Sequence, residues 1–210
     1  MSESITLSEV KKICSTINVG KLLKDSKQSY AEICRFGSIT DRNQIKSIQE
    51  TIRKHKLFDY VDEDQKHLWA FYGYIGADDW VCIEVGSSDD ILEEICGIVK
   101  LMYEPSCDVD KRSVLHKDVV IYKSKSYTDK ICYKYRYMNE LFNEFWWIEI
   151  NVDNHQDGND NGYDKTNFAE VSYAVKNKAL IWNPAPTTTD RKNRTNTEKQ
   201  ILAEVYKINS

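Results

Sequence analysis

The 210-residue sequence has few of the residues on which glycine-dependent and membrane-spanning folds rely. It contains only eight glycines and three prolines, and no glycine-rich phosphate-binding loop is present. Its longest apolar runs, such as residues 145–148, fall far short of the roughly 20 residues that cross a bilayer. The first residues also lack the basic and apolar stretches of a signal peptide. These absences predict a cytoplasmic protein with no membrane partner.

The cysteine and histidine patterns exclude the common metal motifs. The six cysteines are scattered and include no Cys-x-x-Cys pair, and the four histidines lack the His-Glu-x-x-His spacing. A secreted disulfide framework is also not expected, because a chain of this length folds without such cross-links. We therefore expect reduced, partly buried cysteines.

Charge is distributed unevenly along the chain, although the net charge is only −4. Residues 1–58 hold 11 basic and 6 acidic residues, whereas residues 59–110 hold 2 basic and 14 acidic ones. Residues 111–139 are again basic. Such alternation is more informative about partners than the total charge is. It predicts a basic surface near the N-terminus and an acidic surface in the segment that follows.

The N-terminal part, residues 1–58, is predicted to be a helical module resembling a helix-turn-helix. Apolar residues recur at helical spacing through residues 7–57, and Thr40 or Asp41 is a suitable N-cap for the third helix. That helix carries four basic residues, which we identify as candidate nucleic-acid-binding residues: Arg42, Lys46, Arg53 and Lys54. The alternative is an ordinary three-helix module with a solvated basic face.

The pattern changes after residue 58, and residues 59–186 are predicted to form an α+β domain. Two aromatic and β-branched runs flank the turn at residues 76–79 and predict a β-hairpin. Ser87 or Ser88 is the predicted N-cap of the helix that follows the hairpin. The other expected elements of this small antiparallel or mixed sheet and its helices are a short strand at 118–123, a helix at 127–142, a strand at 146–152 and a helix ending near 178. Residues 187–210 are expected to form a mobile segment and a C-terminal helix.

Four residues in this order resemble the GIY-YIG endonuclease pattern over residues 67–184. They are Tyr72 and Gly86 in the hairpin, Glu170 on the last helix of the domain, and Asn183 beyond it. The resemblance implies a nuclease in which Glu170 holds Mg²⁺ and Tyr72 orients the attacking water. Tyr72, Glu170 and Asn183 are thus the candidate catalytic residues, and Glu170 is the candidate metal ligand.

The sequence also departs from that family pattern in ways that weaken catalysis. Ala70 and Glu84 replace the first motif glycine and the second motif tyrosine. Glu93 and Glu94 stand where the family has an arginine, and no lysine or arginine lies between Lys66 and Lys100. A carboxylate in place of a guanidinium inverts the field that would stabilise a phosphoryl transition state. We therefore expect weak or no phosphodiester hydrolysis.

Each residue that matches the family pattern has a structural alternative. Tyr72 is also suited to packing within the hairpin, and Glu170 to an exposed helix surface. Gly86 could be a strand-exit glycine with an unusual backbone conformation. Asn183 precedes Pro184, a pair that commonly starts a turn.

Two further segments admit alternative interpretations. Asp157–Gly162 copies the first half of an EF-hand loop, but the twelfth position is Phe168 rather than glutamate, which favours a polar loop over a Ca²⁺ site. Residues 111–139 interleave basic residues and tyrosines. This pattern fits either nucleic-acid contact or internal compensation of the acidic segment, and the second is slightly favoured.

The sequence therefore leads to three functional hypotheses. The first is a DNA-associated protein with a degenerate GIY-YIG-like domain. The second is a non-enzymatic module that binds a basic protein partner through an acidic surface, since such a surface is complementary to basic partners. The third is a globular protein whose likeness to the nuclease pattern is coincidental.

Overall fold

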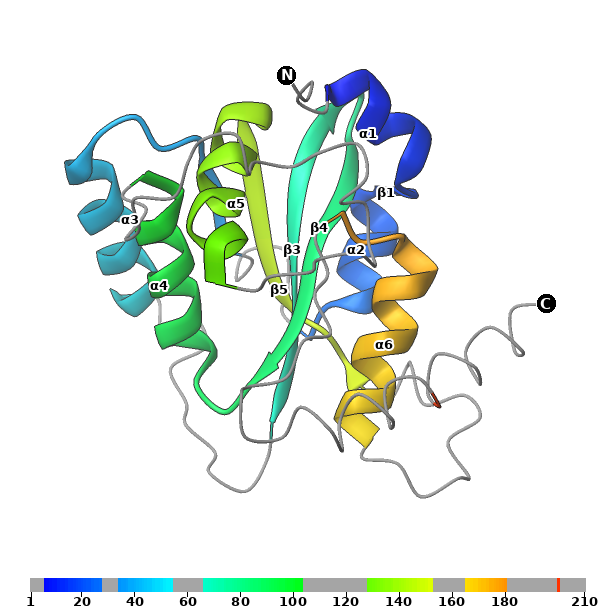
Figure 1. Ribbon diagram of the computed structural model, residues 1–210. Coiled ribbons are helices and arrows are strands. Elements are labelled where there is room, and N and C mark those ends of the chain that lie inside the picture. The colour runs from blue at the N-terminus through cyan, green and yellow to red at the C-terminus, as the bar shows by residue number, and fades with distance from the viewer. Residues whose placement is uncertain are drawn as a thin grey trace.

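The computed structural model describes residues 6–27, 34–54, 66–103, 128–152, 165–180 and 200. Within them the chain forms six helices and five strands (Figure 1). In order, they are α1 (Leu7–Ile13), β1 (Thr16–Asn18), α2 (Val19–Asp25), β2 (Cys34–Gly37), α3 (Arg42–Lys54), β3 (His67–Gly76), β4 (Asp79–Ser88), α4 (Ile91–Tyr103), α5 (Thr128–Leu141), β5 (Glu144–Glu149) and α6 (Lys165–Asn177).

The five strands form one antiparallel sheet in the order β1-β4-β3-β5-β2. The long hairpin of β3 and β4 lies at its centre, with His67 opposite Ser88 at one end and Gly76 opposite Asp79 at the other. The two-residue turn between these strands places Ala77 at φ 55° and Asp78 at φ 60°. Positive φ at both positions is the geometry of a type I′ turn, which matches the twist of the flanking strands.

Helices cover both faces of the sheet, so the protein has two hydrophobic cores (Figure 1). One core joins α3, α4 and α5 to sheet residues such as Trp69, Phe71 and Trp147. The other joins α2 and α6 to residues such as Tyr72 and Trp146. Because side chains alternate along each strand, neighbouring residues of the aromatic runs contribute to opposite cores.

Polar side chains cap the N-termini of several helices. Thr6 and Glu9 form a capping box at α1. The carboxylate of Asp41 accepts hydrogen bonds from the N–H groups of Asn43 and Gln44 at the start of α3, in agreement with its predicted capping role. At α4 the cap is Asp90, which accepts from the N–H of Glu93, rather than the predicted Ser87 or Ser88.

The structure confirms the predicted α+β class and the central hairpin. It also confirms the predicted elements that correspond to α4, α5, β5 and α6. The helix-only N-terminal module is wrong. β1 and β2 form the two edges of the sheet, pairing with β4 and β5, so both predicted parts contribute to one sheet and to both hydrophobic cores. The described helices α2 and α3 do not form a helix-turn-helix, because α2 packs on one face of the sheet and α3 on the other (Figure 1).

Several predictions concern residues that the structure does not describe. They are the strand at 118–123, most of the basic segment at 111–139, Asp157–Gly162, Asn183 and the segment 187–210 apart from Gln200. None of the helices found within the described ranges combines the length and the apolar character needed to cross a membrane.

Candidate functional site

Tyr72, the candidate catalytic tyrosine, lies beneath α6 and has no solvent-exposed surface. Its hydroxyl shares a hydrogen bond with the hydroxyl of Tyr173, which in turn donates to Asp25 Oδ2 on α2 at 3.2 Å. Burial, followed by the neighbouring Tyr173, raises the pKa of Tyr72 well above its ordinary value. This hydroxyl therefore connects α2 and α6 to the sheet and is not exposed to a substrate.

Glu170, the candidate metal ligand, is half-buried on α6, and its Oε2 accepts a hydrogen bond from Ser87 Oγ at 2.8 Å. Tyr173 lies one turn further along the same helix, so Glu170 and the Tyr72–Tyr173 pair are on the same side of the sheet. The described residues contain no group of three or more His, Cys, Asp or Glu side chains suited to holding a metal ion. Within the described ranges Glu170 thus has a serine hydroxyl as its partner and no cluster of further metal ligands, and its role as a Mg²⁺ ligand stays a prediction.

A different acidic group, Glu94 in the first turn of α4, occupies the junction between β4 and α4. Its Oε2 accepts a hydrogen bond from the indole N–H of Trp69 at 3.1 Å. Burial raises the pKa of Glu94 from 4.5 to about 7, although the hydrogen bond from Trp69 opposes this change. The nearby carboxyl groups of Glu84 and Glu170 contribute to this rise in pKa. Glu94 and Glu170 come from helices on opposite faces of the sheet, so carboxyl groups from both faces act on this junction.

Gly86 lets Trp69 pack closely against β4 at this junction. A Cβ atom built on Gly86 would lie 2.4 Å from an atom of the Trp69 ring, so only glycine leaves room for the indole. Its φ lies outside the left-handed range, and the interpretation that it adopts an unusual backbone conformation is wrong. Gly86 is instead a packing requirement for the tryptophan that binds Glu94.

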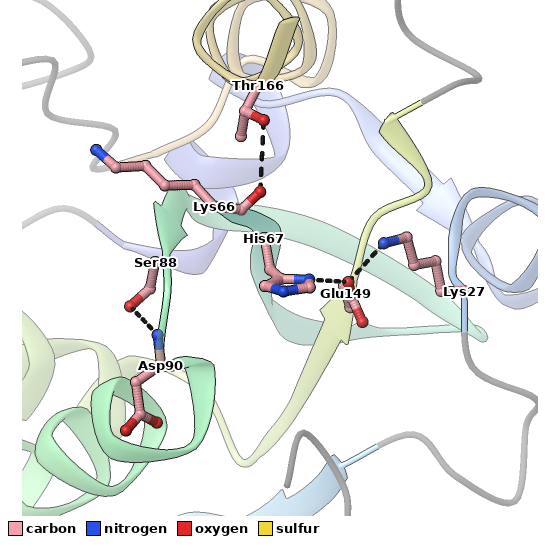
Figure 2. Close-up of polar contacts among 7 residues, drawn as sticks. All are labelled: Lys27, Lys66, His67, Ser88, Asp90, Glu149 and Thr166. Atoms are coloured by element: carbon pink, nitrogen blue, oxygen red, sulfur yellow. Dashed lines mark hydrogen bonds and ion pairs between the residues drawn. The ribbon is translucent and has the colours of Figure 1, made fainter. Parts of the chain in front are cut away.

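A second polar group lies at the same end of the sheet, around the buried carboxylate of Glu149 on β5 (Figure 2). Glu149 Oε1 is 2.9 Å from His67 Nδ1 and 2.7 Å from Lys27 Nζ. Next to His67, the backbone carbonyl of Lys66 accepts a hydrogen bond from Thr166 at the start of α6 (Figure 2). These contacts attach the chain after α2 and the start of α6 to the central strands.

Exposed and half-buried carboxyl groups lie together at the β4–α4 junction. Asp89 and Glu93 are exposed, while Asp90 and Glu94 are half-buried; we call these four residues the acidic surface. From Asp79 to Tyr103 the chain has six acidic residues and one basic residue, Lys100. This part of the molecule therefore carries a strongly negative field.

The four predicted nucleic-acid-binding residues, Arg42, Lys46, Arg53 and Lys54, are all exposed on α3. The opposite side of α3 packs against α4, where Gln49 donates a hydrogen bond to the carbonyl of Cys96 at 3.1 Å. A basic helix surface thus lies beside the helix that carries the acidic surface.

Trp69, Glu94 and Glu149 were not predicted as site residues from the sequence. Glu84 and Glu149 do carry a signal, because each lies between two β-branched apolar residues of the sequence, and a charged residue is rarely buried without a specific partner. No sequence signal indicated that Trp69 binds Glu94, because the packing of α4 on the sheet cannot be read from a local pattern.

Comparison of the chain with protein families, curated proteins and solved structures gives no match.

Proposed function

We propose that this protein is a non-catalytic binding module whose acidic surface holds a basic protein partner. The observation that carries the proposal is the cluster of carboxyl groups at the β4–α4 junction, where the exposed Asp89 and Glu93 lie beside the half-buried carboxyl group of Glu94. A cationic side chain placed beside this group would favour its ionised form. The exposed carboxylates of Asp89 and Glu93 extend the negative field to the surface, where it would attract such a partner.

The arrangement of the nuclease-like residues supports binding over hydrolysis. The Tyr72 hydroxyl is enclosed between β3 and α6, so it has no access to a phosphodiester. Glu94 occupies the region where the family pattern has an arginine, and it holds Trp69 rather than a phosphate. Carboxylates there repel the phosphate backbone that a nuclease must bind.

The proposal is tested by binding of a fluorescent oligo-arginine peptide, measured by anisotropy at low salt. We expect binding that weakens as salt is added, because exposed charges are screened. Neutralising the exposed part of the acidic surface in the Asp89→Asn/Glu93→Gln variant should weaken binding several-fold. Asp78→Asn, at the opposite end of β4, is the matched control and should bind like the wild type. Equal binding by the wild type and the Asp89→Asn/Glu93→Gln variant would contradict the proposal.

A second candidate function is DNA contact through α3, favoured by the exposure of all four of its predicted nucleic-acid-binding residues. A gel shift with duplex DNA at several salt concentrations tests it. If α3 contacts phosphates, Lys46→Gln/Arg53→Gln should weaken binding and flatten its salt dependence, since fewer counterions are released. Unchanged binding by this variant would remove α3 from any DNA interface.

A further inference from the structure

Exposed charges of opposite sign lie on adjacent helices, α3 and α4. Lys46, Arg53 and Lys54 are exposed on α3, and none of them forms an ion pair with another residue in the described ranges. The same holds for the carboxylates of Asp89 and Glu93 at the start of α4. The two sets are therefore available to an external partner.

The two charged sets are also close to each other. The hydrogen bond from Gln49 to the carbonyl of Cys96 fixes α3 against α4. Arg53 on α3, Glu93 on α4 and Asp90 just before α4 all act electrostatically on the Cys96 thiol, so groups of both signs lie near one point of the helix pair. Half-buried apolar side chains, Ile48 on α3 and Leu92 on α4, accompany the charges.

Neighbouring patches of opposite charge are self-complementary under two-fold rotation. In a two-fold dimer each surface patch meets its counterpart on the other copy, so residue i contacts residue j and residue j contacts residue i. Rotation can thus place the basic α3 surface of one copy over the acidic surface of the other, twice in the same interface. A dimer of this kind satisfies both charged sets at once, whereas a purely basic or purely acidic partner satisfies one.

We propose that the α3–α4 surface binds a second copy of this chain, with α3 of each protomer contacting the acidic surface of the other. The inference rests on the proposed function because it uses the same acidic surface. It identifies the basic partner of that surface as α3 of a second copy of the chain. Because the charges are exposed, we expect the association to be weak and sensitive to salt. Self-association would compete with an external basic partner and so regulate access to the acidic surface.

Sedimentation velocity of the full chain tests this inference through a charge swap. The wild type should show a sedimentation coefficient that rises with concentration at low salt, and this rise should vanish in about 1 M NaCl, where the Debye length is ~3 Å. Lys46→Glu/Arg53→Glu and Asp89→Lys/Glu93→Lys should each be monomeric, because reversal places like charges opposite each other. An equimolar mixture of the two variants should associate again, since their reversed surfaces are complementary.

The control variant is Lys24→Glu on α2, which lies on the opposite face of the sheet and should associate like the wild type. The mixing experiment keeps the test independent of folding, because a misfolded variant would not regain association on mixing. A wild type that stays monomeric at low salt, or a mixture that stays monomeric, overturns the inference. If the oligo-arginine peptide still binds in that case, the proposed function stands while the dimer fails.

Discussion

Trp69 on β3 donates its indole N–H to the Glu94 carboxylate on α4 at 3.1 Å. The ring of Trp69 lies against Gly86 on β4, where a larger residue would leave no room for it. The pair of Trp69 and Glu94 connects the central hairpin to the start of α4, where the acidic surface begins. The shape of that surface thus depends on a contact between the sheet and the helix.

The first prediction concerns the pH dependence of stability. The pKa of Glu94 is about 7 in the folded state, against an ordinary value of 4.5, so the folded state binds the proton more tightly than the unfolded state. The stability that this proton contributes is present below pH 4.5 and is lost as the pH rises towards 7. The loss is on the order of 3 kcal/mol, because each tenfold difference in proton affinity between the two states corresponds to ~1.4 kcal/mol.

Glu94→Gln should remove this dependence, because the amide stays neutral and its oxygen can still accept the hydrogen bond from Trp69. Urea unfolding of the wild type and the variant at pH 5 and pH 8 measures the effect. We expect the variant to gain much more stability relative to the wild type at pH 8 than at pH 5. The same difference at both pH values would show that Glu94 has an ordinary pKa.

The second prediction concerns the buried tyrosine pair. In Tyr72→Phe, the hydroxyl of Tyr173 keeps Asp25 as its partner, so the cost should be about 1 kcal/mol. Tyr173→Phe leaves the Tyr72 hydroxyl without this partner in a buried position and should cost more, about 1–3 kcal/mol. Chemical unfolding of the two variants checks the order, and a larger loss for Tyr72→Phe would contradict it.

The third prediction compares two glycines in neighbouring elements. Gly86→Ala should destabilise the protein by about 1–3 kcal/mol, because its Cβ would meet the ring of Trp69, which is itself packed on Trp147. Gly97 lies inside α4 with open space around its Cβ position, so Gly97→Ala should stabilise the protein by up to ~1 kcal/mol. The melting temperature should therefore fall for Gly86→Ala and rise for Gly97→Ala. A neutral Gly86→Ala would show that the indole can move aside.

The fourth prediction concerns the hairpin turn. Ala77 and Asp78 both have positive φ, a conformation that asparagine and glycine adopt more easily. Replacing the pair with Asn-Gly should raise stability by about 1 kcal/mol, whereas Ala77→Val should lower it, because a β-branched residue is strained there. Melting temperatures of the two variants provide the measurement. Equal melting temperatures would contradict the positive φ values.

Much of the fold could be predicted because its main elements are long. The hairpin and the helices α4 to α6 each extend over ten or more residues, which gives their apolar periodicity a clear signal. β1 and β2 have three and four residues, too few to establish a period of two. Their place at the sheet edges depends on pairing with strands far along the chain, which no local pattern specifies.

The site was predicted less completely for a similar reason. Spacing singled out Tyr72 and Glu170, but their partners, Tyr173 and Ser87, depend on packing between residues 101 and 83 positions apart in the chain. Whether a hydroxyl reaches solvent or is buried under a helix is decided by that packing. The acidic character of residues 59–110 was visible in the composition, whereas the burial of Glu94 beside Trp69 required the structure.

An NMR titration with the oligo-arginine peptide tests the central claim most directly. Amide ¹H–¹⁵N spectra of the full chain at low salt report which residues sense the peptide. We expect chemical-shift changes concentrated in residues 87–94, which are lost in the Asp89→Asn/Glu93→Gln variant and persist in Asp78→Asn. No changes in residues 87–94, or changes there that persist in full in the Asp89→Asn/Glu93→Gln variant, would contradict the assignment of the acidic surface as a binding site.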